Sequence, residues 1–219
     1  MHNLITAALV AVPLHALSPA KVLGPDTSMS FFITSAGSGR GGDLGGLTGA
    51  DAHCATLAAL AGATGKTWRA YLSTQGPAER AVSARERIGG GPWHNAKGAL
   101  IARDLDHLHR NPNLRPATAL DEHGNPIPFR PGAWHTRGIL TGSTAEGLAF
   151  SPRVTEDRTC GNWTRSAKGS AMAARFDDST ASGDRNAQWM VVHPTHTCSL
   201  PGLRTRSGEG RFMCFAVNP

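Results

Sequence analysis

The sequence lacks a high density of charge, an apolar run that could cross a bilayer, and a pair of closely spaced cysteines. Charged residues are only 17% of the 219 residues and hydrophobic residues are 40%, which excludes a charge-driven disordered chain and a coiled coil. The uncharged stretch Leu4–Leu17 is shorter than the roughly 20 residues of a membrane-spanning helix. No C-x-x-C pair occurs, so neither a zinc ribbon nor a thioredoxin-type redox site is expected. What remains is the composition of one packed, loop-rich domain.

Asp, Glu, Lys and Arg are all absent from the chain up to Ala20. An apolar stretch of this kind, followed by the small residues of Ser18-Pro19-Ala20, predicts a signal peptide over residues 1–20, although no Lys or Arg precedes it. The alternative is a buried N-terminal helix. With the signal peptide removed, residues 21–219 are expected to form a single domain without a transmembrane segment, in the periplasm or secreted.

The cysteines are four in number and lie far apart, at positions 54, 160, 198 and 214. In an exported protein this pattern predicts two structural disulfides. Four cysteines allow three connectivities, and their spacing does not choose among them. The alternative is a cytosolic protein with four buried free thiols.

Hydrophobic patterning predicts short elements separated by long loops. The predicted strands are Met29–Thr34, Thr67–Ser73, Gln188–His193 and Arg211–Val217. A helix is expected to begin at Thr48, with Asp51 as a capping residue, and to turn Cys54 toward the core. A short basic helix is expected over Ala78–Ile88, and the proline-rich residues 89–131 are expected to be an irregular central loop region.

Several motifs resemble one family. GADAHCATLAALAGATGKTWRAYLS (residues 49–73), HTRGILTGSTAEG (135–147), TCGNWTRSAKGSA (159–171) and GRFMCFAV (210–217) resemble segments of endostatin and of exported bacterial proteins described as lectin-like. This resemblance implies an α+β, C-type-lectin-like domain with two helices, a small twisted mixed sheet and long loops. It also implies the nested disulfides Cys54–Cys214 and Cys160–Cys198, which would join the first helix to the last strand.

No catalytic or calcium-binding motif accompanies the resemblance. The triplets Glu-Pro-Asn, Gln-Pro-Asp and Trp-Asn-Asp of calcium-dependent lectins do not occur, so calcium is not an expected cofactor. No G-x-S-x-G nucleophile elbow is present. The glycine-rich residues 35–46 predict a mobile or tightly turned loop, and because no G-K-[ST] follows them directly, a phosphate-cradling loop is not expected.

Histidines provide the one candidate metal site. Asp106, His107 and His109 would place two imidazoles on one side of an extended segment beside a carboxylate, an arrangement that suits zinc. The alternative is a solvated loop. A second pair, His193 and His196, is separated by Pro194, which prevents helical spacing of the two rings.

Arginines provide the candidate ligand-binding surface. Six of them lie in two late segments, and a disulfide between the segments would draw them together: Arg153, Arg158, Arg165, Arg204, Arg206 and Arg211. Arginine binds planar anions bidentately, so sulfated or carboxylated glycans are expected ligands, and the resemblance to endostatin implies the same. Trp93 and Trp134 could stack on sugar rings. The alternative is a solvated face of a moderately basic protein, with a net charge of +6.

The sequence thus favours an exported, non-catalytic, calcium-independent binding module for an anionic or carbohydrate ligand. The alternative function is a periplasmic zinc-dependent hydrolase that uses the histidine-rich loop between Trp93 and His135. No specific nucleic-acid partner is expected, and nothing in the sequence indicates a protein partner.

Overall fold

The computed structural model describes residues 29–77, 80–128, 138–176 and 193–219, without the side chain of Arg206. The predicted signal peptide lies outside the described residues, as does Gln188 to Val192 of one predicted strand. The helices are α1 (Gly46–Leu60), α2 (Ala84–Arg87), α3 (Leu105–Arg110), α4 (Cys160–Trp163) and α5 (Leu200–Arg206). The strands are β1 (Phe31–Ile33), β2 (Trp68–Ala70), β3 (Trp93–His94), β4 (Leu100–Ala102), β5 (Gly138–Leu140), β6 (Met172–Arg175), β7 (His193–Pro194) and β8 (Met213–Ala216).

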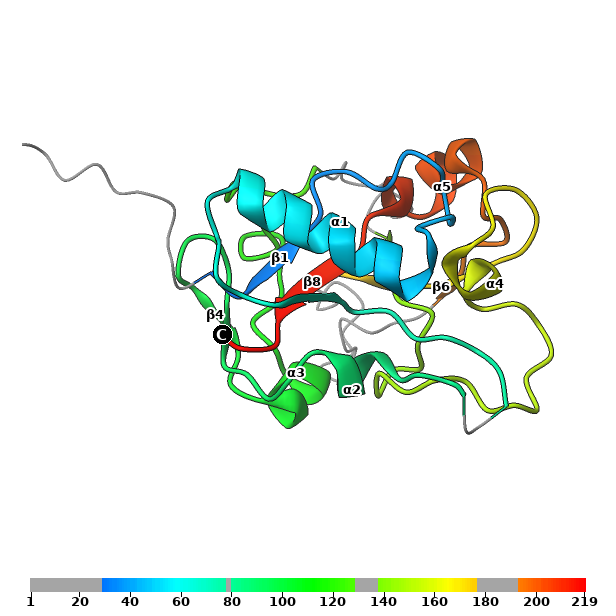
Figure 1. The fold of residues 1–219 in the computed structure, drawn as a ribbon, viewed down its shortest axis with the longest axis horizontal. Coiled ribbons are helices and arrows are strands. Elements are labelled where there is room, and N and C mark those ends of the chain that lie inside the picture. Colours follow the sequence, from blue (N-terminus) through cyan, green and yellow to red (C-terminus); the bar gives the residue numbers. More distant parts are fainter. Residues whose placement is uncertain (1–28, 78–79, 129–137, 177–192) are drawn as a thin grey trace, which may run out of the picture.

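The architecture is mixed α+β, built around a small antiparallel sheet of order β1-β8-β2. The middle strand, β8, pairs with β1 and β2 at the same residue, since Cys214 lies opposite both Phe32 and Ala70. Figure 1 shows α1 lying along one side of this sheet. Strands predicted from apolar, β-favouring runs therefore form where the sequence placed them, although each is shorter than its run.

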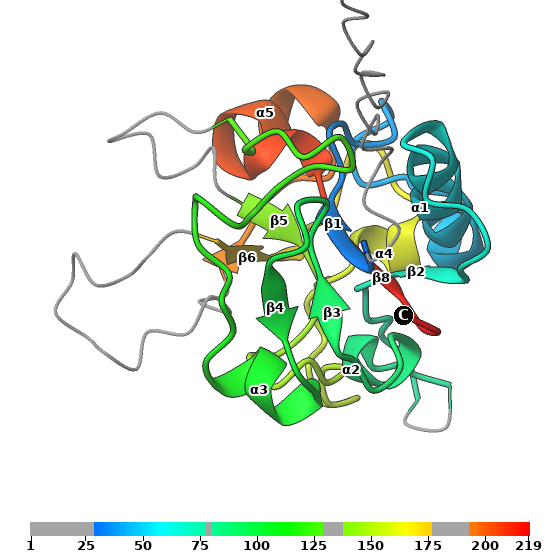
Figure 2. The same cartoon turned by 90° about the vertical axis from the view of Figure 1, so that its left-hand side faces the viewer.

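Side chains of β8 alternate between two apolar cores, as the period of a strand requires. Cys214 and Ala216 point into a core shared with α1, where the disulfide Cys54–Cys214 joins helix to strand. Met213 and Phe215 point into a second core on the opposite face. Figure 2 shows α1 on one side of β1 and β8, and the β3–β4 pair on the other.

The second core corrects the expectation that residues 89–131 are irregular. They contain β3, β4 and α3, and Trp93, Ile101 and Leu108 from this region are fully buried. The turn between the strands is closed by Asn95, whose Oδ1 accepts hydrogen bonds from the backbone N–H groups of Lys97 (3.0 Å) and Ala99 (2.9 Å). Elements this short leave no periodic pattern in the sequence, and frequent prolines concealed them.

Two further expectations were wrong in detail. The described residues contain five α-helices and one 3-10 helix (Gly208–Gly210) rather than two helices, and the sheets are antiparallel rather than mixed. A third sheet of order β5-β6-β7 contacts the central one through an isolated parallel bridge between Leu140 and Phe212. The two disulfides are present with the nested pairing, Cys54–Cys214 and Cys160–Cys198. No helix in the described part of the chain is long and apolar enough to cross a membrane.

Helix α1 begins earlier than its sequence suggests, and Asp51 does not cap it. The N-cap is Gly45, which adopts a left-handed conformation with φ 74°, and no side chain caps the helix. The carboxylate of Asp51 instead faces β2, where it accepts hydrogen bonds from Arg69, Arg87 and the backbone N–H of Ala70. Asp51, which the sequence suggested as a capping residue, thus forms a buried ion pair that joins α1, β2 and α2.

Candidate functional site: a basic end around Cys160–Cys198

The disulfide Cys160–Cys198 joins α4 to the segment just ahead of α5, with both cysteines fully buried. The glycine-rich loop packs directly on it, because the backbone N–H of Gly42 donates to the carbonyl of Cys198 (2.8 Å). A Cβ at Gly42 would lie 2.5 Å from Cys160 Sγ, so only glycine fits there. The sequence allowed a mobile or a tightly turned loop at residues 35–46, and the structure has the tightly turned one.

The α4 segment is a left-handed turn. Its residues all have positive φ, including the non-glycine residues Cys160 (49°), Asn162 (55°) and Trp163 (69°). Such a conformation costs about 1–2 kcal/mol for each non-glycine residue and persists only where neighbours enforce it. The carboxylate of Asp157 accepts hydrogen bonds from the backbone N–H groups of Thr159 (3.1 Å) and Gly161 (3.0 Å) and so supplies part of that support.

Asn162 also supports the turn, because its side chain forms hydrogen bonds with a loop that is distant in the sequence. Its Oδ1 accepts from the backbone N–H of Gln75 (2.7 Å), and its Nδ2 donates to the Gln75 carbonyl (2.9 Å). The indole N–H of Trp163 donates to the carbonyl of Ser73 (2.8 Å). The turn is thus fixed from both sides, and the residues around it hold defined positions.

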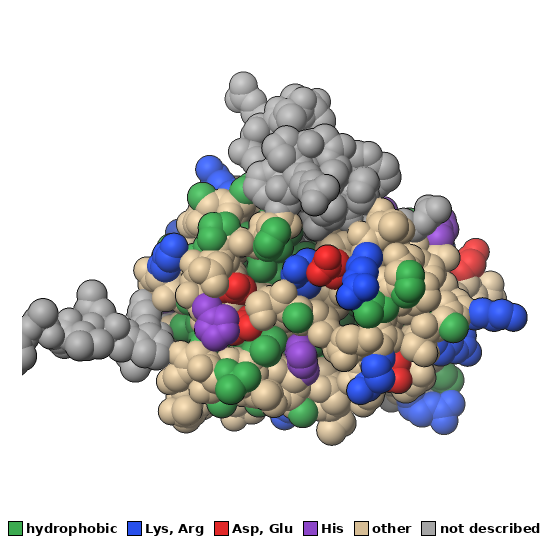
Figure 3. Space-filling model, turned by 90° about the horizontal axis from the view of Figure 1, so that it is seen from above, with side chains coloured by type: hydrophobic (Ala, Val, Ile, Leu, Met, Phe, Trp, Pro, Cys, Tyr) green, Lys and Arg blue, Asp and Glu red, His purple; other side chains and the backbone are tan. Residues whose placement is uncertain are grey.

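The segments that meet at this turn carry several cationic residues, and we call these residues the basic end. They are Arg40, Arg153, Arg158, Arg165, Lys168 and Arg204. Arg40 comes from the glycine-rich loop, which lies against both Cys160 and the start of α5, and sequence reasoning missed it because the loop is distant in the chain. At the end of the molecule that carries α4, Figure 3 shows more Lys and Arg side chains than Asp and Glu side chains.

Some of these cations have weak, exposed partners. Arg40 and Arg165 lie 3.3 Å from Asp43 and Asp157, and their side chains are 59% and 58% exposed. Exposed ion pairs of this kind contribute about 0–1 kcal/mol, so an anionic ligand can displace them. Within the described part of the chain, Arg153, Lys168 and Arg204 form no ion pair.

Arg158 is the most constrained member of the basic end. Its guanidinium carbon lies 6.0 Å from the centre of the Phe150 ring, and its NH2 atom is 3.8 Å from Glu156. Its Nε is buried without a hydrogen-bond acceptor among the described residues. A guanidinium held this way is positioned on an aromatic face, and its NH1 atom lies 3.7 Å from Met172 Sδ.

One predicted ligand-binding arginine, Arg211, is not part of this surface, and the side chain of a second, Arg206, is not described. The side chain of Arg211 is only 11% exposed, and it donates to the carbonyls of Ser35 (3.2 Å) and Gly208 (3.0 Å). It therefore holds the start of β8 against the glycine-rich loop. Arg206 lies in the last turn of α5, but its side chain is outside the described part of the structure.

The predicted stacking role of Trp93 is wrong. Trp93 is fully buried, its Nε1–H donates to the carbonyl of Ala216 (3.2 Å), and its ring packs edge-on against Phe215 at 5.2 Å. A ring with no exposed face cannot stack on a sugar. Trp134 lies outside the described residues.

The predicted metal ligands are not brought together. Asp104 accepts a hydrogen bond from His107 N (2.7 Å) and caps α3, so Asp106, His107 and His109 lie on a helix rather than on an extended segment. Positions two apart on a helix point to different sides. No cluster of three or more metal-ligating side chains occurs among the described residues.

His109 forms a buried pair with Tyr71 instead. Its Nδ1 donates to the carbonyl of Leu105 (2.7 Å), so in the neutral ring Nε2 accepts from the Tyr71 hydroxyl (2.7 Å). Burial lowers the pKa of His109 and raises the pKa of Tyr71. Gly147 covers the pair, since a Cβ there would clash with Tyr71 Oη and His109 Nε2. Sequence reasoning missed this contact between residues far apart in the chain.

Comparisons with known proteins add no functional information. No family model matches the sequence, and no curated protein matches it. The site is therefore interpreted from its own geometry, and the C-type-lectin-like fold remains a prediction.

Proposed function

We propose that this protein is an exported, non-catalytic module of C-type-lectin-like fold that binds an anionic polysaccharide through its basic end, without calcium. The observation that carries the proposal is that three segments rich in cationic residues meet at one crosslinked turn. Two disulfides are typical of proteins that fold in an oxidising compartment, which supports export.

The charge balance of the basic end favours an extended anion. Six cationic side chains share this end with three carboxylates, those of Asp43, Glu156 and Asp157, which leaves a local charge of +3. Asp157 also accepts backbone hydrogen bonds, so it stays in place when Arg165 turns to a ligand. Guanidinium groups bind sulfate and carboxylate through paired donors, and a chain with repeated anions can contact several of them at once.

Salt-dependent binding to heparin tests the proposal. Each sulfate contact releases counterions, so the logarithm of the association constant should fall linearly with the logarithm of salt concentration, as for nucleic acids. Replacing Arg165 and Arg204 together by Gln should reduce the slope by about 1–2 units, because about one counterion is lost per contact.

A matched control replaces Arg103 and Arg115, which are exposed and flank α3 in the chain, by Gln. This control changes net charge by the same amount and should leave the slope unchanged. Equal effects of both double variants would show non-specific attraction to a basic protein and would overturn the proposal. Loss of binding on adding a calcium chelator would contradict its calcium independence.

A further inference from the structure

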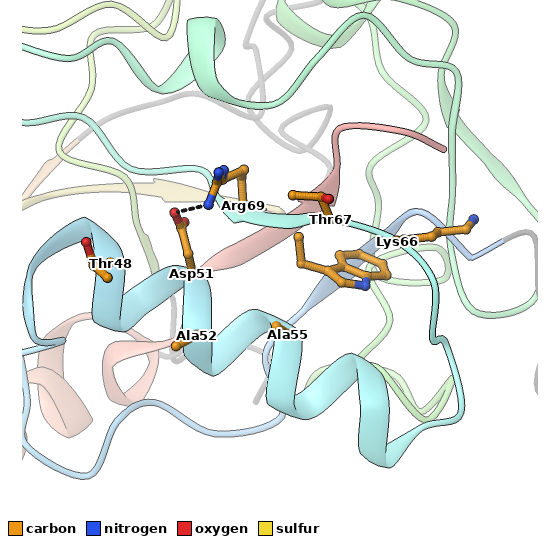
Figure 4. Close-up of a pocket in the computed structure, with 8 residues that line it drawn as sticks. Thr48, Asp51, Ala52, Ala55, Lys66, Thr67 and Arg69 are labelled. Atoms are coloured by element: carbon orange, nitrogen blue, oxygen red, sulfur yellow. Dashed lines mark hydrogen bonds and ion pairs between the residues drawn. The ribbon is translucent and has the colours of Figure 1, made fainter.

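A shallow hollow of about 330 Å³ lies between α1 and β2, apart from the basic end. Three residues line it from the helix, Thr48, Ala52 and Ala55. Trp68 and Arg69 line it from β2, and Lys66 and Thr67 line it from the residues just ahead of β2. Figure 4 shows Asp51 and Arg69 facing each other across the gap between these two elements. Sites for small ligands typically have volumes of about 300–1,000 Å³, so one or two sugar rings fit the hollow.

Charge in the hollow is organised around Asp51. Its carboxylate accepts two hydrogen bonds from Arg87 (2.9 and 2.7 Å), one from Arg69 (3.0 Å) and one from the backbone N–H of Ala70 (2.9 Å). Two guanidinium groups against one carboxylate leave a net charge of +1. The Asp51 side chain is 11% exposed and the Arg69 side chain 44% exposed, so the excess positive charge faces the solvent through Arg69. A ligand carboxylate complements it.

Apart from Lys66, whose Nζ donates to the carbonyl of Met29 (2.9 Å), the rest of the hollow is uncharged. Exposed positions along α1 carry no charged side chain, although a surface helix usually presents charged residues to water: Thr48, Ala52, Ala55, Thr56, Ala59 and Leu60. Trp68 is 3% exposed, and its indole N–H has no acceptor among the described residues. Methyl groups on one wall and threonine hydroxyls at Thr48 and Thr67 match the C–H face and the hydroxyls of a sugar.

We propose that this hollow binds one carboxylated sugar unit of the uronate type. The carboxylate contacts Arg69, the C–H face of the ring lies on Ala52 and Ala55, and ring hydroxyls reach Thr48 and Thr67. This site does not depend on the basic end, so it stands or falls separately from the proposed function.

Titration of ¹⁵N-labelled protein with D-glucuronate tests the proposal. Chemical-shift changes are expected at Thr48–Ala55 and Lys66–Arg69, with the Trp68 indole N–H as a reporter. D-glucose, which lacks the carboxylate, should bind at least about tenfold more weakly, because a charged hydrogen bond contributes more than a neutral one. Equal shifts from glucose and glucuronate, or shifts located elsewhere, would overturn the assignment.

Two substitutions on one helix separate filling of the hollow from effects on the helix. Ala55→Leu places extra bulk in the hollow and should abolish the glucuronate shifts. Ala59→Leu makes the same change at an exposed position outside the hollow and should leave them intact. Arg69→Gln should weaken binding about tenfold or more. If Ala55→Leu binds as well as Ala59→Leu, the ligand is not in the hollow and the proposal fails.

The basic-end variant Arg165→Gln/Arg204→Gln provides the last comparison. It should bind glucuronate unchanged while its heparin affinity falls. Loss of glucuronate binding in this variant would place the monosaccharide at the basic end and would also overturn the proposal.

Discussion

Cys54–Cys214 joins a 15-residue helix to the middle strand of a sheet, whereas Cys160–Cys198 joins a left-handed turn to the segment ahead of a short helix. Around the first disulfide, backbone hydrogen bonds of helix and strand and the packing of apolar side chains hold the chain. Around the second, the chain is held by side chains that bond to backbone, chiefly Asp157 and Asn162, and by close contacts at Gly42. The positions of the residues around Cys160–Cys198 therefore depend more on the crosslink than the positions of the residues around Cys54–Cys214.

Replacing Cys54 and Cys214 by Ala should give the largest loss of stability. The bridge closes a loop of 160 residues, and the chain-entropy model assigns such a loop about 5 kcal/mol. Urea unfolding measures the loss. Because helix and sheet packing still position the chain, the folded fraction should bind heparin with the same salt dependence as the parent protein. Loss of heparin binding by folded protein would show that the first disulfide also shapes the basic end.

Replacing Cys160 and Cys198 by Ala should cost about 4 kcal/mol, since the loop is 38 residues. Here the folded protein should also lose part of the salt dependence of heparin binding, because the turn and α5 are no longer joined. Urea unfolding and heparin titration on the same preparation measure both effects. An unchanged salt slope would mean that Asp157 and Asn162 position the cations without the crosslink.

Gly42→Ala should destabilise the protein by about 1–3 kcal/mol, the usual cost of overpacking. The new Cβ would lie 2.5 Å from Cys160 Sγ and 2.7 Å from Cys160 Cβ. Gly90→Ala is the matched control, since nothing lies within 4 Å of a Cβ there and its φ is not in the left-handed region. The control should stay within about 0.5 kcal/mol of the parent protein. Equal melting temperatures for the two variants would contradict the close packing at Gly42.

The smallest expected effect concerns pH and the region without a disulfide, where Tyr71 meets His109. Burial lowers the pKa of His109 below its ordinary value of 6.5, with the charges of Arg85, Asp106 and Glu146 nearby. The unfolded chain therefore binds more protons than the folded chain as pH falls through 6.5. The free energy of unfolding should decrease in that range by up to about 1.4 kcal/mol per pH unit and level off below the folded pKa.

His109→Gln removes the titrating group at this site, so its free energy of unfolding should lose that decrease while being lower at neutral pH. His196→Gln, at an exposed position, should keep the parent's pH profile. Thermal unfolding in matched buffers between pH 4 and pH 8 measures both, and a profile unchanged by His109→Gln would assign the pH dependence to other groups.

Hydrophobic patterning in the sequence predicted the elements whose structure depends only on their own segment. The apolar run of residues 29–34 and the helical spacing around Cys54 identified β1 and the buried face of α1, because each pattern requires only its own segment. The nested disulfide pairing came from the family resemblance and not from spacing. Contacts between distant segments escaped prediction: Asp51 with Arg87, Tyr71 with His109, and Gly42 with Cys160. Each joins residues whose proximity exists only after the sheet and turns have formed.

The position of β8 between β1 and β2 has a consequence for how the chain is made. Both outer strands are complete by Ala70, whereas the strand between them begins at Met213. As synthesis proceeds from the N-terminus, neither outer strand can find its partner until residues 213–216 have emerged. Sheets built from such distant segments also form slowly. The central sheet of this chain can therefore be completed only when nearly all of the chain has been synthesised.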